Sequence, residues 1–401
     1  MKILVLCNKS PWPKREGGPI AMYAMISGLI QAGHSVKVLA ANTIKYTVDP
    51  ETIPTDFKEK THIEFVDIDL SITVPGALFN FFSGKSYHVT RFHTKAFANK
   101  ITDVLRRDTY DIIQLETLQM ATYLDILRRY SKAAVVLRAH NIEHKIWQRI
   151  AENCPNPIKR FYLNHLYHSL RRFEIGILNK MDGIIAITPV DARNLDRLSH
   201  STNIISIPFG INLESLPENP VQPEEASLFH IGTMNWYPNE ESIKWLLSEV
   251  WPAVTRKLPA IELHLAGRYM PDWLLKLNVP HIHVDGEVPD VWEYMQKYSI
   301  MVVPLFSGSG IRIKIVEAMA AGKAIITTAI GAEGINYENG VHLLIAKDAK
   351  SFTDAIFKLC NDKTLRDTLG KNARLLIAKE HDNNKLMLKL TTFYTELVKK
   401  K

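Results

Sequence analysis

Residues 2–40 read KILVLCNKSPWPKREGGPIAMYAMISGLIQAGHSVKVLA and decide the fold class. Residues 2–7 form a short β-rich apolar run, and residues 19–32 carry apolar side chains at helical spacing until Gly33 stops the helix. Residues 35–40 form a second apolar run. A strand, a helix and a second strand in this order predict two parallel strands joined by a right-handed crossover.

The same alternation continues along the chain and divides it into two series. Further strand-like runs are expected at 63–66, 111–115, 133–137, 183–187 and 204–207, and then at 228–231, 261–266, 281–284, 300–304 and 324–327. A polar, proline-rich stretch at 209–227 separates the series and predicts a linker. We therefore expect an α/β protein with two Rossmann-like doubly wound domains, 1–208 and 228–383. A helix over 384–401 is expected to return to the first domain, and a cleft between the domains is the expected site.

Composition excludes several classes of protein. The chain has 401 residues, of which 46% are hydrophobic and 23% charged, so it contains enough apolar residues to exclude disorder. Its apolar runs are far shorter than the roughly 20 residues that a membrane span needs, and the start of the chain does not resemble a secretory signal. The three cysteines form no CxxC pair. A cytoplasmic protein without disulfides or a zinc site is the simplest expectation.

The net charge of +7 is concentrated in the first half of the chain. Residues 1–208 hold 27 Lys and Arg against 19 Asp and Glu, whereas the remainder is nearly balanced. This asymmetry favours an anionic partner, which would be nucleic acid, a phospholipid surface or a phosphorylated substrate. A solvated surface without a partner explains the charge equally well. Nucleic acid is disfavoured because aromatic residues are not interleaved with the basic ones.

Two polar motifs follow predicted strands of the first domain. Gly17 and Gly18 precede a helix, where a glycine loop lets phosphate approach free backbone N–H groups, although a plain connecting turn is the commoner use. Four polar side chains follow the strand at 133–137, at the edge where doubly wound sheets bind ligands. Hydrogen bonding to a polyol is the preferred role of these four residues, Arg138, His140, Asn141 and Glu143. A metal bound to His140 and His144 is disfavoured.

Residues 306–322 carry the sharpest signal in the chain. A strand ends, a glycine-rich turn follows, and Arg312 and Lys314 fall at the start of a helix. Cations are unfavourable at the positive end of a helix dipole unless an anion is bound, and a diphosphate satisfies this requirement. Glu317, inside the helix, is placed to accept hydrogen bonds from a ribose diol.

These motifs resemble retaining glycosyltransferases of the GT-B fold, family 4. The resemblance covers nearly the whole chain and is most specific in residues 229–340. It is closest to a bacterial subgroup with Gly232-Thr-Met-Asn-Trp-Tyr-Pro-Asn239, Gly308-Ser-Gly-Ile-Arg-Ile-Lys-Ile-Val-Glu317 and Gly331-Ala-Glu-Gly334. Members of that subgroup are similar to enzymes that assemble cell-surface polysaccharides and glycoconjugates.

The resemblance implies roles for individual residues. Glu317 matches the second glutamate of the family's E-x7-E motif, which binds the donor ribose, while Ser309 stands where the first glutamate would fall. Backbone N–H groups at Gly310 and Ile311 are expected to contact the donor sugar instead. Gly17 and Gly18 match the family's glycine loop at the donor phosphate, and His140 matches the histidine near the donor sugar's hydroxyls.

One departure from the family concerns the diphosphate. Many relatives bind it with an arginine and a lysine after the first strand of the second domain, but Thr233 occupies the arginine position and no lysine follows in the turn. We expect Arg312 and Lys314, assisted by Arg268, to take over this role.

The implied activity is metal-independent transfer of a sugar, with retained anomeric configuration, from a nucleotide-sugar to a saccharide or lipid-linked saccharide. In the implied front-face mechanism the leaving phosphate takes the acceptor's proton, so no protein base is named and no cofactor is expected. Residues 75–91 and 145–172 are candidates for peripheral contact with an anionic membrane, although packing within the domain explains them as well. An inactive GT-B scaffold and a GT-B nucleotide-sugar epimerase or phosphorylase remain the alternatives.

Overall fold

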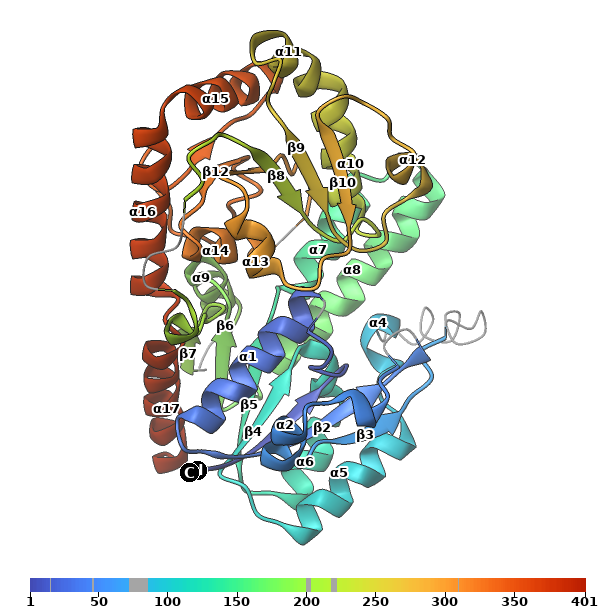
Figure 1. Cartoon of the computed structure of the whole chain (residues 1–401). Helices are drawn as coiled ribbons and strands as arrows, with labels where there is room; N and C mark the ends of the chain where they lie inside the picture. Colours follow the sequence, from blue (N-terminus) through green and yellow to red (C-terminus); the bar gives the residue numbers. More distant parts are fainter. Residues whose placement is uncertain (15, 45–46, 72–85, 200–202, 218–221, 309) are drawn as a thin grey trace. The chain divides into compact units, whose positions relative to one another are not determined.

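The chain folds into two compact units in a computed structural model that describes residues 1–401 except 15, 45–46, 72–85, 200–202, 218–221 and 309 (Figure 1). Unit 1 comprises Met1–Gly210 and Asn384–Lys401, and unit 2 comprises Ile211–Asn383. Part of the segment expected to be a linker therefore belongs to unit 2, where Ile211 pairs with Asp382 in an isolated bridge.

Unit 1 is built on a parallel sheet whose strand order is β3-β2-β1-β4-β5-β6-β7. The seven strands agree with the expected runs to within two residues at each end: β1 (Lys2–Cys7), β2 (Ser35–Asn42), β3 (Glu64–Asp67), β4 (Ile112–Glu116), β5 (Ala134–Ala139), β6 (Gly183–Ala186) and β7 (Asn203–Ser206). Most of the central strands are apolar and buried throughout, as expected for a sheet covered on both faces. The predicted doubly wound α/β architecture is confirmed.

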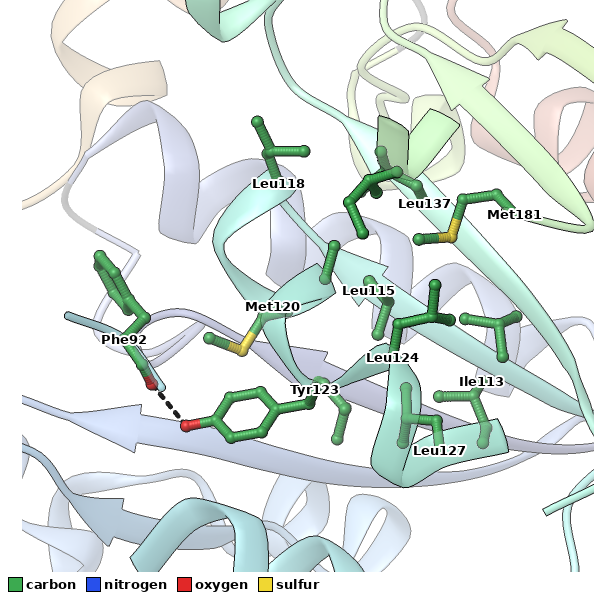
Figure 2. Packing of buried hydrophobic residues seen from close by; sticks show 14 of the residues in the cluster. Phe92, Ile113, Leu115, Leu118, Met120, Tyr123, Leu124, Leu127, Leu137 and Met181 are labelled. Carbon is green, nitrogen blue, oxygen red and sulfur yellow. Dashed lines mark hydrogen bonds between the residues drawn. The ribbon is translucent and has the colours of Figure 1, made fainter. Parts of the chain in front are cut away.

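Helices cover both faces of this sheet, and alternate residues of each strand serve the two faces. Leu4 and Leu6 of β1 join one core cluster, whereas Ile3 and Val5 join the other. Figure 2 shows part of the first cluster, in which the Tyr123 hydroxyl donates a hydrogen bond to the Phe92 carbonyl. The helices and helical turns are α1 (Gly17–Gln31), η2 (Pro50–Thr52), α2 (Thr55–Thr61), α4 (Tyr87–Thr90), α5 (Lys95–Arg107), η3 (Leu118–Tyr123), α6 (Leu124–Tyr130), α7 (Glu143–Glu152), α8 (Pro157–Leu178), α9 (Pro189–Leu198) and α17 (Asn383–Lys399).

The C-terminal helix α17 packs on unit 1, as expected from the sequence. Its apolar side chains Leu390, Phe393, Tyr394 and Leu397 belong to the same core cluster as Val5 of β1. The first unit is thus completed by residues that follow the whole of unit 2 in the sequence.

Unit 2 is built on a second parallel sheet with the strand order β10-β9-β8-β11-β12-β13. Its strands are β8 (Leu228–Ile231), β9 (Leu263–Ala266), β10 (Ile282–Gly286), β11 (Ile300–Val303), β12 (Ala324–Thr327) and β13 (Leu344–Ile345). The two-residue strand β13 was not expected, because a run this short has no detectable periodicity. Its helices and helical turns are η4 (Leu213–Ser215), α10 (Tyr237–Trp245), η5 (Leu246–Val250), α11 (Trp251–Lys257), α12 (Asp272–Leu275), α13 (Val291–Gln296), α14 (Ile313–Ala320), α15 (Ala349–Asn361) and α16 (Lys363–Glu380).

Each sheet changes its winding direction at one place. The change falls between β1 and β4 in unit 1 and between β8 and β11 in unit 2. Because the crossover connections diverge at such a point, the carboxyl ends of the two strands leave room for a ligand. The polar motifs of the sequence follow these strands and the adjacent β5. None of the helices in the described part of the chain is long and apolar enough to cross a membrane.

Candidate functional site

In unit 1 a buried carboxylate organises the carboxyl end of the sheet. Cys7, Glu116 and Arg138 are register partners on the neighbouring strands β1, β4 and β5, and all three are buried. The Arg138 guanidinium donates to Glu116 Oε2 at 3.0 Å and to the Ala21 carbonyl of α1 at 3.2 Å. A buried ion pair of this kind orders the strand ends and the start of α1 relative to each other.

Glu116 also holds His140, which follows β5. His140 Nε2 lies 2.6 Å from Glu116 Oε2, and since an ionised carboxylate only accepts hydrogen bonds, Nε2 carries a proton; in a neutral imidazole this leaves Nδ1 as the acceptor nitrogen. Burial favours a raised pKa for Glu116, but the charge of Arg138 and the hydrogen bond from His140 outweigh it and hold the pKa below its ordinary value. The carboxylate is therefore ionised, and it orients His140, whose side chain is 14% exposed.

The network continues away from His140 into the core. Gln114 donates to Glu116 Oε1, and the Tyr394 hydroxyl of α17 donates to Gln114 Oε1. Burial, with the charge of Glu116, raises the pKa of the Cys7 thiol well above its ordinary value, so Cys7 is a neutral neighbour of this network. The C-terminal helix thus supports the carboxylate that positions His140.

The other predicted residues of unit 1 lie at the starts of α1 and α7. Gly17 and Gly18 form the first turn of α1, slightly earlier than expected because Pro19 is tolerated in a first turn. A methyl group on Gly18 would lie 3.0 Å from Lys9 Cε, so the side chain of Lys9 crosses this helix start. The lysine is a further cation at the loop that the sequence motif did not single out.

Glu143 begins α7, whose first turn is capped by a carboxylate of α8. Glu174 Oε1 accepts from the Glu143 N–H at 3.0 Å, and Glu174 Oε2 accepts from the His144 N–H at 2.9 Å. His144 Nδ1 lies 2.6 Å from the same oxygen, so His144 is part of the cap. Asn141 is half-buried in the preceding turn. Arg138 is 1% exposed and its guanidinium donates to Glu116 and Ala21, and its predicted role in hydrogen bonding to a polyol stays a prediction.

In unit 2 the turn after β8 meets the N-terminal end of α14. Lys314 Nζ donates to Asn239 Oδ1 at 2.8 Å and lies 3.2 Å from His230 Nε2. His230 Nδ1 lies 2.8 Å from the Val302 carbonyl, so it donates there and leaves Nε2 as an acceptor for the lysine. A methyl group on Gly232 would lie 3.0 Å from Lys314 Nζ, which places the ammonium group directly beside the turn.

Arg312 is the N-cap residue of α14 and lies against the same turn. Its guanidinium stacks over the Trp236 ring at 5.3 Å and donates to the Gly310 carbonyl at 2.9 Å. Gly308 has a φ of +113°, and a methyl group there would lie 2.8 Å from the Arg312 guanidinium. A glycine is therefore required at this position to accommodate the arginine.

Burial shifts the pKa values of both ionisable groups of α14 toward neutrality. Burial, together with the charge of Arg312, lowers the pKa of Lys314 to about 7, and burial raises the pKa of Glu317 to about 7. Both shifts reflect the free-energy cost of holding a charged group in a buried environment. A ligand that brings an anion to Lys314 and hydroxyl donors to Glu317 would stabilise the charged forms and offset this cost.

The remaining predicted donor residues differ in how closely they approach this cluster. The Thr233 carbonyl accepts from Asn239 Nδ2 at 2.9 Å, which ties the turn to the residue that holds Lys314. Arg268, after β9, is paired with Glu287 at 3.0 Å, and its carbonyl accepts from the Met234 N–H. Ile311 is half-buried before α14, and Ser309 lies outside the described residues.

Sequence reasoning missed several residues that the structure brings into these clusters. Glu116 directly follows a predicted strand that lies beside the one before Arg138, and this adjacency was the available signal. Trp236 and Asn239 stand in the motif at 232–239, but their contacts with α14 cross about 75 residues of chain. No local pattern indicates such contacts.

Comparisons with known proteins agree for both halves of the chain. The model of the family described as glycosyltransferase family 4 matches residues 16–215, and that of glycosyl transferases group 1 matches residues 225–362. An uncharacterized 44.6 kDa protein in the cps region of Klebsiella pneumoniae is 20% identical over 96% of this chain and 97% of its own length.

Two further similarities extend this picture. A relative in Campylobacter jejuni is the N,N'-diacetylbacillosaminyl-diphospho-undecaprenol alpha-1,3-N-acetylgalactosaminyltransferase. It is 30% identical over 31% of this chain and 33% of its own length. The structure of HepE from Anabaena in complex with UDP and glucose superposes with a TM-score of 0.67 at 15% identity, covering 98% of this chain and 99% of that one. Since glycosyltransferase families match both halves and the two parallel sheets have the corresponding fold, this chain is a GT-B glycosyltransferase that transfers sugar from a nucleotide-sugar donor.

Proposed function

We propose that this chain is a retaining, metal-independent glycosyltransferase that builds cell-surface polysaccharide or glycoconjugate on a saccharide or lipid-linked saccharide. The observation that carries the proposal is the placement of Arg312 and Lys314 against the turn after β8. That turn is where the family resemblance puts a diphosphate-binding arginine and lysine, and where this chain has Thr233 instead. The two cations of α14 thus supply the missing positive charge from a different element.

Unit 2 provides the groups that a nucleotide diphosphate requires. Arg312 and Lys314 at the start of α14, together with the positive end of its dipole, stabilise the charge that develops on the leaving diphosphate. Glu317, one helical turn beyond Lys314, accepts hydrogen bonds from the ribose hydroxyls. Because the protein supplies positive potential itself, the proposed reaction does not depend on a divalent metal.

Unit 1 contributes the groups that position the sugar and the acceptor. The Glu116 carboxylate fixes His140 with Nε2 protonated, so its other ring nitrogen is available to accept from a sugar hydroxyl. In the proposed front-face reaction the bond from the anomeric carbon to the diphosphate breaks. The acceptor oxygen bonds to the same face, and its proton passes to the departing phosphate oxygen. His140 orients and polarises the substrate and takes no proton.

The donor and acceptor are proposed by class. UDP-sugars are the first donors to test, because the related fold of the Anabaena protein holds UDP and glucose. A diphospho-lipid-linked saccharide is the first acceptor, because the Campylobacter relative is named for one.

The start of α8 supports a contact with an anionic membrane. Ile158 and Phe161 are 83% and 69% exposed, and Lys159 and Arg160 lie between them in the sequence. Apolar side chains interleaved with cations favour the interface of an anionic bilayer. Most of the second candidate stretch, 75–91, lies outside the described residues.

Binding of nucleotides to the purified chain tests the donor site. We expect one of UDP, GDP, CDP or ADP, or its sugar, to raise the melting temperature equally with and without EDTA. Lys314→Met should weaken binding at least tenfold. Lys323→Met, which removes another buried lysine, serves as the control and should leave the affinity unchanged. Equal affinity of Lys314→Met and wild type contradicts the assignment of Lys314.

Product analysis separates the proposed reaction from its alternatives. With the stabilising nucleotide-sugar and a lipid-linked acceptor, NMR should show a product with the donor's anomeric configuration. Interconversion of nucleotide-sugars without an acceptor indicates an epimerase instead. Nucleotide binding without turnover on any acceptor indicates an inactive scaffold, the alternative suggested by Ser309 in the position of the family's first glutamate.

Co-sedimentation with vesicles tests the membrane contact. Wild type should bind vesicles rich in phosphatidylglycerol and not those of phosphatidylcholine, and the double variant Ile158→Ser, Phe161→Ser should lose most of this binding. Equal binding of the variant and the wild type contradicts the contact.

A further inference from the structure

A cluster of two histidines and a glutamate lies on the sheet of unit 2, outside the groups proposed for catalysis. Glu262 precedes β9 and His264 lies in it, so these residues are two apart and share a face of the sheet. His283 of the edge strand β10 is the direct register partner of His264. Their donor atoms, one from each residue, all lie within 4.8 Å of one another.

The distances fit a shared ion better than hydrogen bonds. Glu262 Oε2 lies 3.6 Å from His264 Nε2, and Glu262 Oε1 lies 3.6 Å from His283 Nε2. Contacts of this length are too long for hydrogen bonds. Ligand atoms arranged tetrahedrally about a cation with bonds of about 2.0–2.2 Å are separated by roughly 3.3–3.6 Å. The carboxylate thus lies at a ligand-to-ligand distance from both histidines. The two imidazole rings stack with centroids 4.5 Å apart and planes 11° apart, so a side-chain rotation of one ring is needed to aim both Nε2 lone pairs at one small cation.

A second layer of contacts orients His264 toward that position. Asp285 Oδ2 lies 3.3 Å from His264 Nδ1 and accepts from the Tyr294 hydroxyl at 2.8 Å. The carboxylate keeps the proton on Nδ1 and directs the lone pair of Nε2 toward Glu262. Tyr298 stacks on the His264 ring at 4.1 Å. A carboxylate on the outer nitrogen of a histidine is the usual support of a metal-bound imidazole.

We propose that Glu262, His264 and His283 form a binding site for a divalent cation of the zinc type. Two imidazole nitrogens and one carboxylate favour Zn²⁺, Co²⁺ or Ni²⁺ over Mg²⁺ and Ca²⁺, which prefer oxygen ligands. Glu262 and His283 are 52% and 46% exposed, so an ion can enter and a water can complete its coordination.

The site clamps a sheet edge and takes no part in the proposed transfer. Glu262 stands before the amino end of β9, whereas Gly267 and Arg268 follow its carboxyl end. A bound ion would join the edge strand β10 to β9, and strands at an edge are held from one side alone. It would thereby stabilise unit 2 without altering the donor groups.

Titration of the full-length protein with ZnCl₂ in a calorimeter tests the site. We expect wild type to bind one equivalent that His283→Asn and Glu262→Gln each weaken at least tenfold. His281→Asn is the matched control, because it makes the same change two residues away at an exposed position outside the cluster and should bind as wild type does.

A spectroscopic titration gives a second readout independent of transferase activity. Co²⁺ in a site with two nitrogens and an oxygen should produce visible absorption bands, which should disappear when Zn²⁺ displaces the Co²⁺. Zn²⁺ should raise the melting temperature of wild type and of His281→Asn, but not that of His283→Asn or Glu262→Gln. The proposal is overturned if wild type binds no Zn²⁺ or if His283→Asn and Glu262→Gln bind it as tightly as His281→Asn. Because no nucleotide is involved, failure here leaves the proposed glycosyl transfer untouched.

Discussion

The affinity of this enzyme for its nucleotide-sugar should depend on pH through two side chains of α14. Burial lowers the pKa of Lys314 to about 7 in the absence of ligand. A bound diphosphate favours the charged ammonium group, so binding requires a proton that the free protein increasingly lacks as the pH rises. Replacing Lys314 with Met removes this requirement together with the charge.

The size of the effect follows from the pKa. The protonated fraction of free Lys314 is about half at pH 7, roughly one in eleven at pH 8 and about one in a hundred at pH 9. The dissociation constant should therefore rise about fivefold between pH 7 and 8 and about tenfold more between pH 8 and 9. If Lys314 instead had the ordinary pKa of a surface lysine, about 10, the dissociation constant would not change over this range.

Glu317 should produce the opposite dependence below neutrality. Burial raises its pKa to about 7, so the carboxylate that we propose accepts hydrogen bonds from the ribose becomes protonated as the pH falls. Affinity is thus expected to be greatest near pH 7. Lys314→Met should flatten the alkaline side of the profile, and Glu317→Gln should flatten the acidic side.

Calorimetric titration with a nucleotide-sugar between pH 6 and 9 measures both sides. A nucleotide-sugar is the suitable ligand because its diphosphate has no ionisation in this range, unlike the terminal phosphate of a free nucleoside diphosphate. Repeating the titration in buffers of different ionisation enthalpy reports the proton taken up. A profile that is flat above pH 7 in wild type, or equally steep in Lys314→Met, would refute the reasoning.

Three further predictions concern stability and metal dependence. Gly267→Ala should prevent unit 2 from folding, because a methyl group would lie 1.7 Å from the Gly232 carbonyl oxygen. Gly286→Ala has no neighbour within 4 Å and should lower the free energy of unfolding by only about 1 kcal/mol. Circular dichroism and urea unfolding distinguish the two variants. Glu116→Gln should lower the free energy of unfolding by about 3 kcal/mol, because Arg138 stays buried without its counter-charge, and an unchanged urea midpoint would contradict this. EDTA should leave the rate of transfer unchanged in a direct assay, and loss of activity that Mg²⁺ restores would contradict metal independence.

Much of the fold was predictable because buried parallel strands are apolar along their whole length and need no partner to be recognised. Limits between neighbouring helices were less predictable. Apolar side chains recur at helical spacing over 351–379, but this region is two helices, because Asp362 caps α16 by accepting from the Leu365 N–H. Residues 145–172 also belong to two helices, α7 and α8, and Asn156 caps α8 by accepting from the Lys159 N–H. A short polar side chain inside a helical pattern is compatible with one continuous helix or with a new helix that it caps. The sequence pattern does not distinguish the two, because the choice depends on how the neighbouring helices pack.

The candidate site was predictable where its residues share one local element. Arg312, Lys314 and Glu317 are close in sequence, and two cations at a helix start indicate a bound anion whatever the rest of the fold. Thr233 raised the question of what replaces the missing arginine, but it did not identify the answer. Contacts of Lys314 with Asn239 and of Arg312 with Trp236 required the structure.

The sequence by itself determined the α/β class and the order of the strands along the chain, and it predicted an anion at the start of α14. These properties depend on periodicity and on charges within a single turn, which are local. Tertiary structure alone decided that Glu116 fixes His140, that α17 supports this carboxylate through Tyr394, and that His264 and His283 stand side by side. Each of these depends on the register of neighbouring strands or on the docking of a distant helix. Such contacts are set by packing of the whole unit, so they leave no pattern along the chain.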